Sequence, residues 1–163
     1  MDFLDKISRF LNQVLVLIAG LFLVGMILLT CSNILLRMVW VPVKGTFELI
    51  GFFCAIVTAF ALGHTQIKRG HVGIDIVVNK FSTKARKILS SINYLICMIF
   101  FAIAGWQIAQ WATTLWKTGE VTETLRIIFY PFTYAVALGC LVLALVLLVE
   151  LVKVLIEGKG AQR

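Results

Sequence analysis

Cysteine and histidine are the side chains of this sequence that could hold a metal ion or a haem. The four cysteines, Cys31, Cys54, Cys97 and Cys140, fall in four different apolar segments, and no two have the Cys-x-x-Cys spacing of a metal site. Four helices could in principle converge on a shared site, but a lone cysteine in an apolar helix usually serves as a small hydrophobic side chain. We therefore expect no metal site and no disulfide.

The two histidines, His64 and His71, are seven residues apart at one edge of an apolar segment. A haem inside a helical membrane protein needs ligands on facing helices at membrane depth, and the other three apolar segments contain no histidine. The sequence therefore predicts no cofactor. We interpret His71, which lies near Arg69 and Asp75, as part of a structural hydrogen-bonding group.

Charged side chains are missing from the interior of all four apolar segments, where they would mark an ion or substrate path. The sequence also lacks a Walker A motif, an HExxH motif and matched Gly or Pro interruptions of the kind that form transporter sites. These patterns predict that the chain is not an enzyme and does not transport a solute by itself. They favour an accessory subunit.

Polar residues gather instead where the apolar segments end. The candidates for pairing across helix ends or for contact with a second subunit are Arg37, Glu48, Arg69, His71 and Asp75. For each of them a solvated loop charge is the alternative interpretation. Glu48 follows Thr46, a candidate helix N-cap, and would place its carboxylate at the positive end of a helix dipole.

Four apolar segments must position these residues: 11–36, 49–67, 88–116 and 127–149. Of the 163 residues, 61% are hydrophobic and 14% charged, whereas soluble domains average about 45–50% and about 25%. Each segment provides roughly the 20 apolar residues that a membrane-spanning helix needs. We predict an all-α integral membrane protein with four transmembrane helices, folded as one domain over residues 1–163.

The connection between the second and third segments contains a further helical pattern. Ile74, Val77, Val78 and Phe81 recur at spacings i, i+3, i+4 and i+7, with polar residues between them. This pattern predicts a short amphipathic helix that lies flat in the membrane interface.

The distribution of basic residues predicts the orientation of the chain. Of the 15 Lys and Arg residues, 11 lie in the N-terminal segment, the second connection and the C-terminal segment, and 4 lie in the other two connections. Basic residues in short loops stay in the cytoplasm, so we expect both termini inside the cell. The net charge of +7 is then explained by orientation and by anionic lipids of the inner leaflet, and we expect no nucleic-acid binding.

Four features in order resemble a known family. Arg37 ends the first segment, and Gly45-Thr46-Phe47-Glu48-Leu49 opens the second. Residues 69–75 (Arg-Gly-His-Val-Gly-Ile-Asp) follow the second segment, and residues 119–127 with Tyr130-Pro131 open the fourth. Together with the span count, this arrangement resembles the small membrane subunit (DctQ type) of tripartite ATP-independent periplasmic (TRAP) transporters.

The resemblance implies partners and a function. A periplasmic substrate-binding protein would deliver an organic anion, a carboxylate or a sulfonate, to a large elevator-type membrane subunit in the bacterial inner membrane. That large subunit would carry the substrate and Na⁺ sites, and this chain would be its static scaffold in a heterodimer. Glu120, Glu123 and Arg126 would lie where the binding protein docks.

Two other functions are compatible with four apolar helices. A membrane anchor for a respiratory or other enzyme complex would need cofactor ligands at membrane depth. A self-assembling channel would need polar faces that line a pore.

Overall fold

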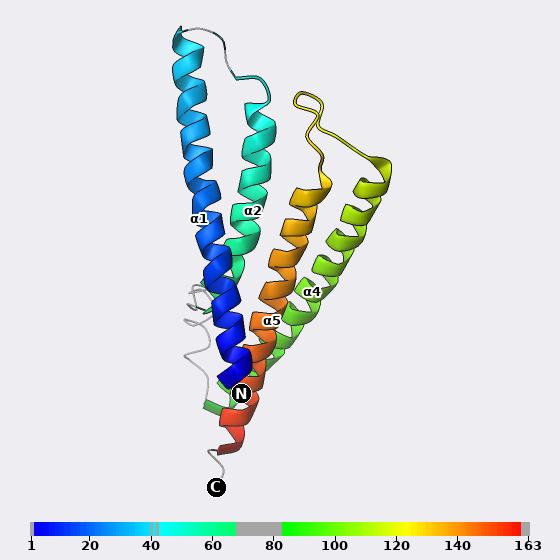
Figure 1. The fold of residues 1–163 in the computed structure, drawn as a ribbon. Coiled ribbons are helices and arrows are strands. Elements are labelled where there is room, and N and C mark those ends of the chain that lie inside the picture. The colour runs from blue at the N-terminus through cyan, green and yellow to red at the C-terminus, as the bar shows by residue number, and fades with distance from the viewer. Residues whose placement is uncertain (1, 40, 42, 68–82, 161–163) are drawn as a thin grey trace.

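The computed structural model describes residues 2–39, 41, 43–67 and 83–160, and these form four long helices (Figure 1). They are α1 (Asp2–Val39), α2 (Thr46–Ile67), α4 (Thr83–Thr118) and α5 (Tyr130–Gly160). Each is long and apolar enough to cross a membrane, which confirms the all-α class and the four predicted spans. The predicted amphipathic helix at 74–81 lies outside the described residues.

Neighbouring helices along the chain run antiparallel, and both termini lie at one end of the molecule (Figure 1). We call this the terminal end. At the opposite end, the loop end, α1 and α4 finish and α2 and α5 begin. The fourth helix begins at Tyr130, three residues later than the apolar pattern predicts, because the preceding residues fold into a loop.

The helix α5 lies at the centre of the fold. It packs against α4, α2 and, less extensively, α1, whereas α4 packs along α5 and hardly touches α1 or α2 within the described part of the chain. In the most apolar stretch of α5, 44% of the residues are buried, but in that of α4 only 6% are. The molecule is therefore a compact group of α1, α2 and α5 with α4 attached to one side.

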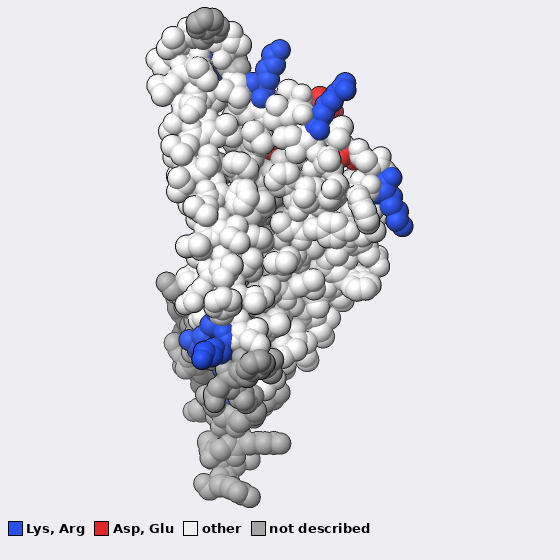
Figure 2. Space-filling view, in the orientation of Figure 1, with Lys and Arg blue, Asp and Glu red and all other residues white. Residues whose placement is uncertain are grey.

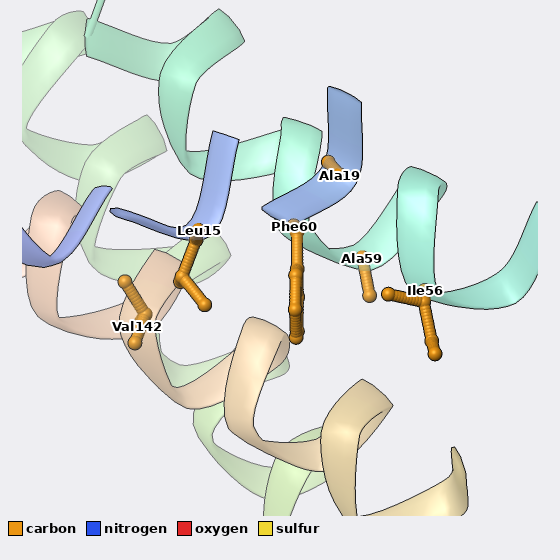
Figure 3. Packing of buried hydrophobic residues seen from close by; sticks show 6 residues of the cluster. All are labelled: Leu15, Ala19, Ile56, Ala59, Phe60 and Val142. Carbon is orange, nitrogen blue, oxygen red and sulfur yellow. The ribbon is translucent and has the colours of Figure 1, made fainter. Parts of the chain in front are cut away.

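The hydrophobic core joins α1, α2 and α5. Its buried side chains come from all three helices and interdigitate in the middle of the molecule (Figure 3); they are Leu15, Ala19, Ile56, Ala59, Phe60 and Val142. Close approach of α2 and α5 depends on Gly139, where a Cβ would lie 2.8 Å from the backbone oxygen of Ala59. Small residues let membrane helices come together in this way because packing, not burial from water, holds them in lipid.

Charged side chains lie at the two ends of the molecule, and its middle is apolar (Figure 2). At the loop end the exposed basic residues include Lys44, Lys117 and Arg126. At the terminal end Lys153 lies 3.5 Å from Glu150 on the same face of α5. This separation matches a chain whose middle is in contact with hydrocarbon and whose ends reach the polar interface.

Candidate interaction site at the loop end

The residues between α4 and α5 form a small closed loop, which we call the hairpin loop (Gly119–Phe129). Gly119 ends α4 in the left-handed conformation (φ +67°) and donates its N–H to the carbonyl of Leu115 at 3.0 Å. This is a common way to end a helix, since glycine adopts positive φ without steric cost. A single antiparallel bridge then pairs Val121 with Ile128.

Thr122 holds the hairpin loop together from inside. It is only 4% exposed, its N–H donates to the carbonyl of Ile127 at 2.9 Å, and its hydroxyl accepts the N–H of Ile127 at 3.1 Å. Its carbonyl accepts the N–H of Arg126, whose φ of +53° turns the chain back. The loop therefore has a fixed backbone conformation that depends on one buried threonine.

Glu48 fastens the hairpin loop to α2. Its two carboxylate oxygens accept the backbone N–H groups of Thr124 at 2.8 Å and Leu125 at 3.1 Å. Hydrogen bonds to a carboxylate are stronger than those between neutral groups. This contact joins parts of the chain that are 76 residues apart and so links the start of α2 to the loop that precedes α5.

Leu125 packs directly over Gly45, the residue before α2. A Cβ built on Gly45 would overlap the Leu125 side chain, and the φ of Gly45 is +75°. Glycine is therefore required here both for backbone conformation and for space. Gly45 and Glu48 are three residues apart, and this short segment contacts both the side chain and the backbone of Leu125.

Aromatic rings continue the contact toward the middle of the molecule. Phe52, one turn below Glu48, stacks on Phe132 of α5 with ring centroids 4.2 Å apart and meets Phe129 edge-on at 5.4 Å. On the other side of α5, the hydroxyl groups of Tyr134 and Thr113 lie 2.9 Å apart. The loop ends of α2 and α4 are thus both connected to α5.

The connection between α1 and α2 is fixed by polar contacts. The side-chain oxygen of Asn33 accepts the N–H of Val43 at 2.9 Å, and the hydroxyl of Thr46 donates to the carbonyl of Val43 at 2.7 Å. The prediction that Thr46 caps α2 is wrong in its geometry, since its hydroxyl faces the preceding residues and acts as a donor. The carbonyl that begins the helix is that of Gly45, which accepts the N–H of Leu49.

The structure brings some of the predicted site residues together and not others. Glu48 lies against the hairpin loop that carries exposed Glu120, Glu123 and Arg126, and its partners there are backbone N–H groups. Arg37 is exposed in the last turn of α1, and no ion pair joins it to Glu48 among the described residues. Three further candidates, Arg69, His71 and Asp75, lie outside the described residues.

A second polar contact, which the sequence did not reveal, lies near the terminal end. The Nδ2 of Asn12 on α1 lies 3.5 Å from Nδ1 of His64 on α2. Asn12 is 2% exposed, and its Oδ1 has no hydrogen-bond partner within the described part of the chain. A Cβ at Gly63 would lie 2.7 Å from that oxygen, so this glycine gives the amide its space. Asn12, at the start of the uncharged first segment, is the sequence feature that could have indicated the contact.

The cysteines do not converge. Cys31 and Cys54 are exposed, Cys97 is partly covered and Cys140 is buried. Among the described residues no group of three or more His, Cys, Asp or Glu side chains is arranged to hold a metal ion.

Comparison with known proteins identifies the family. Residues 26–157 match the family model described as "Tripartite ATP-independent periplasmic transporters, DctQ component". The match covers most of the chain, including the start of α2, the hairpin loop and nearly all of α5. No curated protein and no solved structure matches the chain. The family consists of non-enzymatic transporter components, so the match excludes the enzyme-anchor alternative and implies that other subunits exist. The chain belongs to the DctQ family: it is a multi-pass membrane component of a tripartite periplasmic transporter.

Proposed function

We propose that this chain is the scaffold subunit that braces the large, elevator-type membrane subunit of a TRAP transporter during Na⁺-coupled uptake of an organic anion. The transported carboxylate or sulfonate is delivered by a periplasmic binding protein. The chain lies in the bacterial inner membrane with its terminal end in the cytoplasm, where its basic residues meet anionic lipids.

The observation that carries this proposal is the fastening of the hairpin loop to α2 by Glu48. A scaffold must keep its own helices in fixed positions while its partner moves. The contact of Leu125 with Gly45 and the stacking of Phe52 on Phe132 add to this connection across α2 and α5. A rigid loop end and an apolar middle suit a static part better than a moving one.

The hairpin loop is also the proposed contact for the binding protein. Glu120, Glu123 and Arg126 are exposed, and the loop that carries them is held in one conformation. A preorganised loop binds a partner without losing conformational freedom at that moment. With the terminal end inside the cell, this loop faces the periplasm.

Reconstitution of uptake tests the scaffold function. The large subunit and the binding protein are placed in proteoliposomes with and without this chain, and Na⁺-driven uptake of a labelled organic anion is measured. We expect uptake to require the chain. Uptake at an undiminished rate without it would show that the large subunit needs no brace.

A further inference from the structure

The helix α4 uses only one of its faces within this chain. That face packs against α5 and carries Gly105, Ala112 and Leu115, the buried residues among those of α4 whose burial is described. A Cβ at Gly105 would lie 3.0 Å from the side chain of Leu141 and 3.3 Å from that of Cys140, so the two helices approach closely there. The opposite face of α4 is not covered by any described residue.

The depth of Gly105 in the membrane follows from its neighbours on α5. Cys140 and Leu141 lie ten and eleven residues after Tyr130, where α5 begins. At a rise of about 1.5 Å per residue, this places Gly105 about 15 Å from the loop end of the span. The span itself contains 25 residues and is about 37 Å long. Gly105 therefore lies close to the middle of the membrane.

The uncovered face of α4 carries a line of residues at spacings of three or four. Such spacing keeps successive side chains on one side of a helix and is typical of the seam between two packed helices. We call this line the α4 seam; its members are all exposed, and they are Ile92, Ile96, Ile99, Ile103, Gln107, Gln110 and Thr114. At about 100° per residue, Gln107 points about 200° away from Gly105 and so away from α5.

One glutamine of the α4 seam, Gln107, lies at a depth where lipid offers no hydrogen bonds, and a second, Gln110, lies nearer the interface. Gln107 is two residues from Gly105, or about 3 Å along the helix axis, and Gln110 is one turn further toward the loop end. Both are exposed, and neither side-chain amide has a partner within the described part of the chain. In hydrocarbon an amide without partners costs free energy, whereas an amide that meets a polar group on a second helix stabilises the helix pair.

We infer that the α4 seam is the surface on which a transmembrane helix of the large membrane subunit packs, and that this helix presents hydrogen-bonding groups to Gln107 and Gln110. The inference rests on the proposed function, which supplies the large subunit as the partner. The Gln107 amide makes lipid tails alone an unfavourable covering of the seam, and the four isoleucines supply the stiff apolar surface of a packed helix. Because the family is defined by a transporter of unlike components, the unlike membrane subunit is favoured over a second copy of this chain.

Site-specific photo-cross-linking tests this assignment in the assembled transporter. A photoreactive amino acid replaces Ile103, which is 58% exposed on the α4 seam, or Leu21, which is 67% exposed on α1. Leu21 serves as the control because it lies two residues from Ala19 of the hydrophobic core and, like Ile103, lies within a membrane span. We expect Ile103 to cross-link to the large subunit and Leu21 not to do so. Cross-links from Ile103 to a second copy of this chain, or only to lipid, would overturn the assignment.

Substitution of the glutamines tests the hydrogen bonds. The double variant Gln107→Leu, Gln110→Leu keeps the side-chain volume similar on an exposed face, so we expect the chain itself to fold normally. The amount of large subunit that co-purifies with the chain should fall about tenfold, since an interhelical hydrogen bond in a membrane contributes on the order of 1 kcal/mol. Gln13→Leu, the same chemical change on exposed α1, should leave the yield of complex unchanged.

The outcomes separate this inference from the proposed function. If the wild-type chain binds the large subunit and uptake depends on it, but the double variant binds equally well, only the assignment of the α4 seam is wrong. If the wild-type chain neither binds the large subunit nor affects uptake, the proposed function itself is wrong.

Discussion

The carboxylate of Glu48 accepts the backbone N–H of Thr124 at 2.8 Å, although the two residues are 76 positions apart in the chain. The second carboxylate oxygen accepts the N–H of Leu125, whose side chain rests on Gly45. The start of α2 and the glycine that precedes it thus hold both the backbone and a side chain of the hairpin loop. The arrangement makes the loop end a single packed unit, and several consequences can be measured.

Replacing Glu48 should loosen the hairpin loop. Glu48→Gln keeps one carbonyl oxygen but loses the charge and one acceptor, so we expect a partial fall of Tm in detergent and faster proteolysis between Gly119 and Phe129. Glu48→Ala should show the larger effect. The exposed residues Glu120 and Glu123 provide controls, because neither accepts a hydrogen bond through its side chain in the described structure. Equal Tm values for the wild type and Glu48→Ala would show that the contact does not hold the loop.

Gly45→Ala should destabilise the protein by about 1–2 kcal/mol from the positive φ alone, and further through overlap with Leu125. In the double variant with Leu125→Ala the steric part should disappear, and a double-mutant cycle of unfolding free energies would reveal that coupling. The control is Gly51→Ala on α2, where a Cβ meets nothing within 4 Å. There we expect no loss, since alanine favours a helix more than glycine does.

Gly139→Ala should force α2 and α5 apart, because the added methyl group would lie 2.8 Å from the backbone oxygen of Ala59. Overpacking of this kind costs about 1–3 kcal/mol. Reversible unfolding in mixed micelles provides the measurement. Gly20→Ala on α1 adds the same methyl group in open space and should be neutral or slightly stabilising; a similar loss in both variants would argue against the close contact.

Asn12→Leu should leave stability unchanged or raise it by up to about 2 kcal/mol, since a buried acceptor without a partner is costly and leucine has a similar volume. The partner His64 is only partly covered, so its ring is not left fully buried without Asn12. A clear fall in Tm would instead show that Asn12 stabilises the fold, through its contact with His64 or through its amide oxygen.

Charge reversal on the hairpin loop tests the proposed docking of the binding protein. In Glu120→Lys, Glu123→Lys we expect several-fold more binding protein to be needed for half-maximal uptake, with an unchanged maximal rate and a smaller effect at high salt. Lys6→Glu, at the terminal end, should have no such effect. An unchanged requirement for binding protein in the loop variant would place its docking surface elsewhere.

The sequence predicts the helices well because long uncharged runs permit few other structures in lipid. It predicts less about contacts between distant residues. The binding of Glu48 to backbone N–H groups could not be foreseen. Nearly every residue has such a group, so the sequence does not mark the ones that bind, and Thr124 is 76 residues away. Gln107 and Gln110 were missed for a different reason. A search for intramembrane charge passes over neutral amides, and only the packing of Gly105 against Cys140 and Leu141 shows how deep they lie.

The way in which Glu48 holds the hairpin loop also affects how freely the loop can change in evolution. Since the carboxylate binds main-chain N–H groups, the side chains at 120 and 123 are not needed to keep the loop closed. Mutations at these positions can alter the charge that the loop presents to a binding protein without disrupting the backbone conformation of the loop. A transporter of this design could adapt to a new binding protein through a few surface substitutions while its membrane architecture stays the same.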